Sequence, residues 1–158
     1  MLRICLGITF FLFVQLSVQA NTEQNKISIV LDNFHQAASD ANQQQYFKLL
    51  TDNSIFIGTD ATERWDKKAF EAFAKPYFDK GLGWTYIPRN RHVTIAKSGH
   101  VAWFDEMLDS QSYGECRATG VLELTKNGWK ISQYHLTIPV PNELAKNVVK
   151  QIKELSHK

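Results

Sequence analysis

The chain has 158 residues, a formal net charge of +2 and a hydrophobic fraction of 44%. This length suits one domain, and the hydrophobic fraction is sufficient for a core. A net charge this small gives no sign of the clustered basic surface that nucleic-acid binding requires. We therefore expect no nucleic-acid partner.

The first 20 residues have the features of a secretory signal peptide. Arg3 precedes an apolar run over residues 4–14, and the stretch ends in the small-x-small pattern Val18-Gln19-Ala20. The run is shorter than the roughly 18–20 residues that a membrane span needs. We expect cleavage after Ala20 and a secreted or periplasmic domain of residues 21–158 without a membrane span. An uncleaved N-terminal anchor is the alternative. Cys116 would be the one remaining cysteine, which excludes an intrachain disulfide.

Helical periodicity dominates the first half of the remaining chain. Apolar residues recur at helical spacing over residues 24–41, and Asn42 is a candidate N-cap for a short second helix. A short strand is expected at residues 55–57. Asp66 is a candidate N-cap for a third helix over residues 67–80.

Strand patterns fill the chain from there to a final amphipathic helix, for which Asn142 is a candidate N-cap. We expect Ser98-Gly99 and Asn127-Gly128 to be two-residue hairpin loops. The order of elements predicts an α+β fold, with helices packed on one face of a curved sheet. The predicted strands cover residues 84–88, 91–97, 100–109, 115–125 and 129–138.

Short segments spread over most of this region form a recognisable series. They are Phe56-Ile57-Gly58-Thr59-Asp60 with Trp65, Gly99-His100-Val101-Ala102-Trp103, Arg117-Ala118-Thr119, and Gly128-Trp129-Lys130-Ile131 leading to His135-Leu136-Thr137. In this order they resemble the SnoaL-like branch of the nuclear transport factor 2-like superfamily. The resemblance implies a cone, in which a curved antiparallel sheet wraps around N-terminal helices and a pocket, with a C-terminal helix. It implies no particular reaction, because that superfamily includes cyclases, isomerases, dehydratases and kinase association domains.

The neighbours Asp105 and Glu106 lie inside an apolar strand, so their carboxylates point to opposite faces of the sheet. Counting outward from the predicted hairpin loop, His92 pairs with Asp105 and Arg91 pairs with Glu106. The resemblance implies that Asp105, on the same face as Trp103, points into the pocket and that Glu106 lies on the outer face. The alternative is that both are solvated pairs at the surface.

His135 and Arg117 are two further candidates for the site. His135 can carry a proton near neutral pH, and the resemblance implies that it points into the cone. Arg117 in a pocket would select an anionic ligand, whereas an ion pair with Glu115 or Glu123 is the alternative. A strict two-residue turn at Asn127-Gly128 places Arg117 and His135 on opposite faces, and a β-bulge would place them on one.

We expect an exported domain that binds a small apolar or amphipathic molecule of unknown identity. One alternative is an isomerase, cyclase or dehydratase that uses Asp105 with His92 or His135. Another is a homodimeric protein-interaction module. No His/Cys cluster with metal spacing and no glycine-rich phosphate loop occurs, so no metal or cofactor is expected. The candidate catalytic residues are Asp105 and His135, and the candidate pocket residues are Tyr46, Trp65, Tyr77, His92, Trp103 and Arg117.

Overall fold

The computed structural model describes the backbone of residues 5–156 and the side chains of residues 22–155. The predicted leader, residues 1–20, lies outside the described side chains. The elements are α1 (Cys5–Ser39), α2 (Gln43–Lys48), β1 (Leu50–Ile57), β2 (Arg64–Asp66), α3 (Lys67–Phe78), β3 (Tyr86–Ile95), β4 (Val101–Ser110), β5 (Gly114–Thr125), β6 (Gly128–Thr137) and α4 (Asn142–Ser156).

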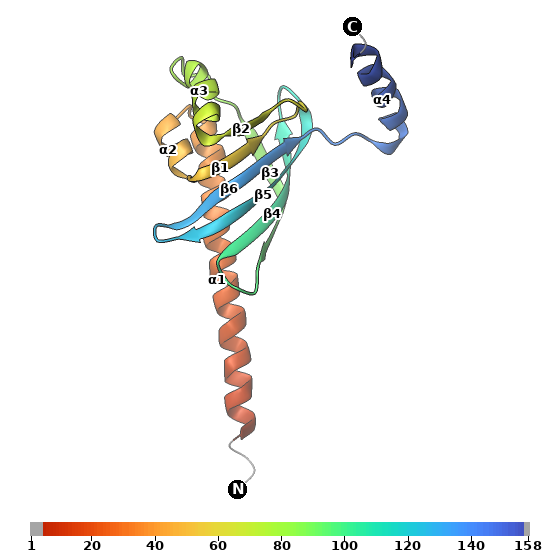
Figure 1. Ribbon diagram of the computed structural model, residues 1–158. Helices are drawn as coiled ribbons and strands as arrows, with labels where there is room; N and C mark the ends of the chain where they lie inside the picture. The colour runs from red at the N-terminus through yellow and green to blue at the C-terminus, as the bar shows by residue number, and fades with distance from the viewer. Residues whose placement is uncertain (1–4, 157–158) are drawn as a thin grey trace.

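The six strands form one curved sheet in the order β2-β1-β6-β5-β4-β3. Neighbouring strands are antiparallel except β1 and β6, which are parallel. The helix α1 lies against one face of the sheet, α2 and α3 lie at one end of it beside β1, and α4 extends away (Figure 1). The predicted α+β fold with a curved sheet, N-terminal helices and a C-terminal helix is confirmed.

The core lies between α1 and the sheet. Ile27, Leu31 and Phe34 recur at helical spacing on α1 and are buried. On β5, Cys116, Ala118 and Leu122 are buried with Gly120 between them, and the intervening residues are more exposed. Burial of this apolar surface supplies the main favourable term for folding. The alternation on β5 therefore identifies the inner face of the sheet.

Two of the three predicted N-caps, Asn42 and Asp66, are confirmed, whereas Asn142 is the first residue of α4 rather than its cap. The Asn42 side chain accepts a hydrogen bond from the backbone N–H of Gln45 at 3.1 Å, and Asp66 accepts one from Ala69 at 2.8 Å. Each cap satisfies an N–H that has no partner within its helix. The third helix ends at Phe78, slightly earlier than expected.

The first two strands differ from the prediction. β1 begins at Leu50 rather than at residue 55, and β2 was not predicted. β2 is three residues long and carries two exposed charged residues, so it has no hydrophobic alternation to reveal it.

β3 is one strand where two were predicted. The register with β4 shifts between Arg89 and His92, and Asn90 has a positive φ of 50°. Asparagine tolerates this conformation better than most residues, so the chain forms a bulge there instead of a break. Beyond the bulge, His92 faces Asp105 as predicted.

The β5–β6 hairpin differs from the prediction at its loop. Thr125 pairs with Gly128, which has a φ of 93°, so the loop is Lys126–Asn127 rather than Asn127-Gly128. A turn followed by glycine in a left-handed conformation is a common hairpin form.

A bulge farther along the same hairpin sets the face of each β6 side chain. Leu122 pairs with Ile131 and Val121 with Gln133, which leaves Ser132 as an extra residue. Because of this insertion, Ile131 and Tyr134 are both buried. The bulge alternative is therefore confirmed.

Gly120 allows the sheet to pack closely beside this bulge. A Cβ atom at Gly120 would lie 2.6 Å from the ring of Phe104 and would also clash with the backbone carbonyl of Gln133. Any larger residue would have to displace one of these neighbours.

Candidate functional site

Glu106 is the charged residue at the centre of the fold. Its side chain is fully buried, its Oε2 accepts a hydrogen bond from Nε of Arg91 at 2.6 Å, and its Oε1 lies 2.6 Å from Nε2 of His35. The predicted pairing with Arg91 is confirmed, but the predicted outer-face position of Glu106 is wrong. Val93 and Phe104 share this face, and it is the face that packs against α1.

Arg91 compensates the buried carboxylate. Its Nη1 also donates to the carbonyl of Ser28 at 3.0 Å and to Asp32 at 2.7 Å. Burial alone would lower the pKa of Arg91, but Glu106 and Asp32 together raise it above its usual value. Arg91 therefore stays charged and balances Glu106, since a buried charge needs a partner.

Asp105 does not point into the cone. Its side chain is 57% exposed and lies 3.2 Å from Nδ1 of His92, which is 72% exposed. Trp103 lies on the same outer face and is 48% exposed. The prediction that these three residues line a pocket is wrong, because the core covers the opposite face of β4.

Arg117 and His135 also lie on this outer face. Asp105 pairs with Thr119, and Thr119 pairs with His135, so their side chains form one row across the sheet. Arg117 faces Met107 and Thr137 in the next row of that face. The bulge brings Arg117 and His135 to one face, but it is the face away from α1.

The alternation of apolar and polar residues on β5 indicates which face of the sheet is buried, and it would have placed Glu106 on that face. Cys116 and Ala118 alternate with Arg117 and Thr119, which is the pattern of a strand with one buried side. Ala118 pairs with Glu106, so Glu106 must share the buried side.

A cavity of about 450 Å³ opens beside His35 at the end of the sheet covered by α2 and α3. We call it the aromatic cavity. Tyr46, Trp65 and Tyr77, which were predicted to line a pocket, all lie in its wall. Other aromatic wall residues are Phe34, Phe56, Phe70, Phe73, Trp84, Tyr86, Tyr113 and Tyr134.

The aromatic rings of this wall pack against one another in a continuous series. Phe56 stacks on Phe70 with ring centroids 3.8 Å apart, and on Tyr134 at 5.3 Å. Trp65 stacks on Phe73 at 5.1 Å. Such pairs add stability beyond the area that they bury, so the wall is held in place by its own contacts.

His35 and Tyr134 are the polar groups closest to Glu106 in the wall. The two rings meet edge to face with centroids 6.3 Å apart. Burial, and next the negative charge of Glu106, raise the pKa of Tyr134 well above its ordinary value, so its phenol stays protonated. Sequence reasoning did not select either residue.

The imidazole of His35 is oriented by Glu106. Nε2 lies against the carboxylate oxygen of Glu106, so Nδ1 is the ring nitrogen that remains for another partner. Nδ1 has no hydrogen-bond partner among side chains 22–155. A histidine whose second nitrogen is held by a carboxylate is a suitable proton acceptor for a bound molecule.

Metal ligands do not gather in the described part of the chain. No group of three or more His, Cys, Asp or Glu side chains there is arranged to hold a metal ion. Among those same residues, no helix is both long enough and apolar enough to cross a membrane.

The curved sheet, the helices inside it and the cavity at one end define a protein of the nuclear transport factor 2-like fold. The chain belongs to the SnoaL-like domain family, whose model matches residues 27–141. Comparison with curated proteins gives no match.

Solved structures show the same fold at low sequence identity. An NTF2-like protein of unknown function from Pseudomonas putida KT2440 superposes with a TM-score of 0.66 and 16% identity, over 78% of this chain and 91% of that one. A protein provisionally assigned as a dehydratase of the NTF2-like family, from Streptomyces avermitilis, superposes with a TM-score of 0.65 and 13% identity, over 77% of this chain and 99% of that one. A protein with a cystatin-like fold from Nostoc punctiforme superposes with a TM-score of 0.62 and 14% identity, over 87% of this chain and 98% of that one.

Proposed function

We propose that the chain binds a small planar molecule with one polar group in the aromatic cavity. The observation that carries this proposal is the position of His35. It lies among the aromatic residues that make up half of the wall, and its ring is held by Glu106; the wall also carries Glu63 and five Ser, Thr or Gln residues. Binding pockets are typically apolar, with a few polar groups that orient the ligand.

The dimensions and chemistry of the cavity set the ligand class. A volume of about 450 Å³ lies within the range of small-molecule sites. Flat rings can stack on walls such as Phe73 and Trp65, while a hydroxyl or carbonyl group would bond to His35 or Tyr134. We therefore infer a ring compound with a hydroxyl or carbonyl group.

Calorimetric titration with 2-naphthol and with naphthalene tests this proposal. We expect 2-naphthol to bind more tightly, and the variant Phe73→Ala to weaken its binding. Trp103→Ala is the matched control, because Trp103 is a similarly exposed aromatic residue on the outer face, and it should leave binding unchanged. Equal effects of the two substitutions, or no binding, would contradict the proposal.

A second candidate function is proton transfer on the bound molecule. The specific observation in its favour is the 2.6 Å contact between His35 and Glu106 at the cavity. His35 would remove a proton next to a carbonyl group through Nδ1, and the Tyr134 phenol would donate a hydrogen bond to the oxygen on which charge develops. This is the chemistry of isomerases and dehydratases, and it replaces the role first given to Asp105.

Hydrogen–deuterium exchange next to the carbonyl of 2-tetralone, followed by NMR, tests this second function. We expect His35→Gln to abolish enzyme-dependent exchange and Asp105→Asn to leave it unchanged. If the unsubstituted protein causes no exchange above the buffer rate, the chain is a binding protein only.

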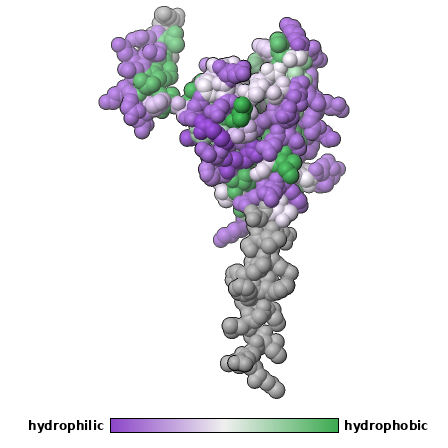
Figure 2. Space-filling model, turned by 180° about the vertical axis from the view of Figure 1, so that it is seen from behind, coloured by the Kyte–Doolittle hydropathy of each residue, from purple (hydrophilic) through white to green (hydrophobic). Residues whose placement is uncertain are grey.

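Export and self-association complete the proposal. Export rests on the leader-like sequence of residues 1–20. Homodimer formation is supported by the exposed outer-face residues Val101 and Trp103 and by α4. Figure 2 shows a hydrophobic band along one side of α4, which includes exposed Leu144 and Ile152. Such surfaces often mark protein interfaces.

A further inference from the structure

The wall of the aromatic cavity carries a carboxylate, that of Glu63, which is half-buried. Among the described residues that line the cavity there is no lysine and no arginine. His35 is the other group of the wall that can carry charge near neutral pH, and a positive charge on its ring would face the carboxylate of Glu106. The charge of the wall that is left for a ligand is therefore negative.

The carboxylate of Glu63 is held at the edge of the cavity by the loop between β1 and β2. The backbone N–H of Gly58 donates a hydrogen bond to the carbonyl of Glu63 at 2.9 Å, which closes this loop. Oε2 of Glu63 accepts a hydrogen bond from the backbone N–H of Asp60 at 3.2 Å. A Cβ atom at Gly58 would clash with the same oxygen, so the glycine allows this close approach. Gly58 and Thr59 also line the cavity, which places the carboxylate at its wall.

Glu63 has no cationic partner within the described part of the chain, because it takes part in none of the ion pairs there. Arg64 follows it, but Arg64 alternates on β2 with Trp65, which lines the cavity, so Arg64 points to the opposite side. Asp60 adds a second negative charge to the same loop. Hydrogen bonds from the side chain and the backbone of Thr62 lower the pKa of Asp60, so it stays ionised.

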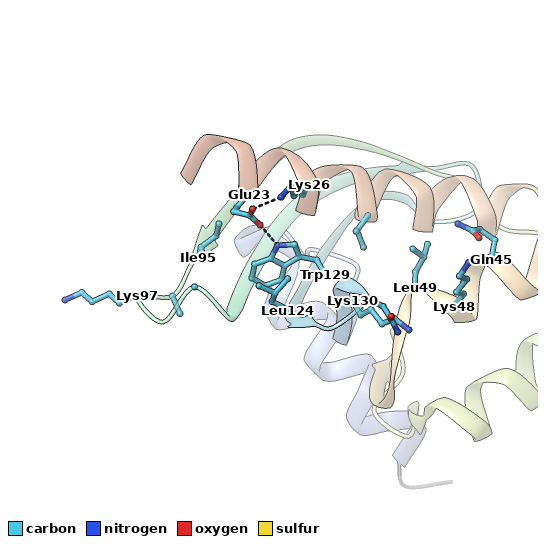
Figure 3. Close-up of a pocket in the computed structure, with 15 residues that line it drawn as sticks. Glu23, Lys26, Gln45, Lys48, Leu49, Ile95, Lys97, Leu124, Trp129 and Lys130 are labelled. Atoms are coloured by element: carbon cyan, nitrogen blue, oxygen red, sulfur yellow. Dashed lines mark hydrogen bonds and ion pairs between the residues drawn. The ribbon is translucent and has the colours of Figure 1, made fainter. Parts of the chain in front are cut away.

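A second hollow of the molecule shows the contrast. It is a groove of about 1190 Å³ between α1, the end of α2 and the tips of the β3–β4 and β5–β6 hairpins (Figure 3). Glu23 in its lining accepts hydrogen bonds from Lys26 at 2.7 Å and from the indole of Trp129 at 2.9 Å. A cationic ligand would have to displace Lys26 from Glu23, whereas it would meet no such competitor at Glu63.

Aromatic rings surround the part of the wall that carries Glu63. Burial is the main cause that raises the pKa of Tyr86 to about 12, and electrostatic interactions with Tyr113 and Glu63 contribute. These three residues therefore lie close together, and all three line the cavity. The faces of tyrosine and tryptophan rings attract cations. Ring faces beside an unneutralised carboxylate favour a positively charged group over a neutral or negative one.

We propose that the ligand of the aromatic cavity carries an ammonium group and that this group binds Glu63. Glu63 is then the residue that selects a cationic ligand, through a charge-assisted hydrogen bond. This inference rests on the proposed function, because it concerns the same cavity, and it adds the charge of the ligand. The ligand class becomes a primary amine that carries an aromatic ring.

Calorimetric titration at neutral pH with 2-naphthylmethylamine, 2-naphthylmethanol and 2-naphthoate tests this inference. The three ligands share one ring system and carry a cationic, a neutral and an anionic group. We expect the amine to bind most tightly and 2-naphthoate least tightly. Glu63→Gln should weaken binding of the amine about tenfold, because a charge-assisted contact is lost, and should leave binding of the alcohol unchanged. The unchanged affinity for the alcohol also shows that the cavity of the variant is intact.

Glu123→Gln is the matched control. Glu123 is also half-buried, but it pairs with Val101 and Lys130 on the outer face of the sheet. The substitution makes the same change in net charge and should leave the affinity for the amine unchanged. The reversed charge in Glu63→Lys should make 2-naphthoate bind more tightly than the amine.

The inference is overturned if the unsubstituted protein binds the alcohol as tightly as the amine. It is also overturned if Glu63→Gln weakens both ligands equally, or if Glu123→Gln weakens the amine as much as Glu63→Gln does. In each of these cases the proposed function stands as long as 2-naphthol binds. If neither 2-naphthol nor any of the three ligands binds, both the proposed function and this inference fall.

Discussion

Nε2 of His35 and Oε1 of Glu106 lie 2.6 Å apart in the core, although 71 positions separate the two residues in the sequence. Arg91 holds the other oxygen of Glu106 at 2.6 Å. The three side chains join α1, β3 and β4 at one point, and His35 carries this arrangement to the wall of the aromatic cavity. The same contact therefore serves both the packing of the cone and its candidate site.

The neighbours Glu106 and Asp105 should differ sharply in their effect on stability. Glu106→Gln leaves the Arg91 charge without its buried partner, so we expect the free energy of unfolding to fall by about 3 kcal/mol. Asp105→Asn removes only an exposed contact with His92 and should cost less than about 1 kcal/mol. Urea denaturation followed by circular dichroism measures both. A larger loss for Asp105→Asn would contradict the assignment of faces.

Stability should fall at high pH because of the buried tyrosines. Burial raises the pKa of Tyr46 and Tyr134 well above the ordinary value and raises that of Tyr86 to about 12. Between pH 10 and 12 the unfolded chain loses these protons while the folded chain keeps them. The free energy of unfolding should thus fall by about 1.4 kcal/mol per pH unit for each of Tyr46 and Tyr134, and by less for the half-buried Tyr86.

Ultraviolet absorbance of the phenolate gives the measurement for that prediction. Tyr46 and Tyr134, two of the five tyrosines, should ionise only when the fold is lost, so part of the absorbance change should coincide with loss of circular dichroism. Complete ionisation of all five while the protein is still folded would rule out the buried placement.

The leader prediction has a direct test in a bacterial expression host. Intact-mass measurement of the exported protein should give the mass of residues 21–158, with Asn21 at the N-terminus. Full-length protein that remains with the membrane fraction would instead support the uncleaved anchor.

Self-association through the outer face should depend on Trp103. Light scattering after size-exclusion chromatography should give twice the monomer mass, and Trp103→Glu should halve that mass by placing a charge in the interface. Tyr77→Glu is the matched control, because Tyr77 is similarly exposed but lies outside that face. A monomeric unsubstituted protein would refute the dimer.

The helix caps and the hairpin pairing were predicted correctly because they depend on residues that are close together along the chain. Asn42 and Asp66 cap their helices through contacts three residues away, and the pairing of His92 with Asp105 follows from counting along one hairpin. Such features depend on near neighbours and therefore appear in the sequence.

The functional face could not be predicted in the same way. Trp103 and Phe104 lie on opposite faces of β4, so hydrophobicity on that strand alone did not distinguish inside from outside. The choice depends on which face α1 covers, and on the bulge at Ser132, both of which are tertiary features. His35 was overlooked because its role exists only once Glu106 is placed beside it.

NMR spectroscopy of the histidine side chains during titration with 2-naphthol tests the central claim most directly. The resonance of His35, identified by its loss in His35→Gln, should shift saturably with ligand, with the largest change at Nδ1. The side chains of His92 and His135 on the outer face should not shift. Saturable shifts at His92 or His135 without a shift at His35 would contradict the claim that the aromatic cavity is the binding site.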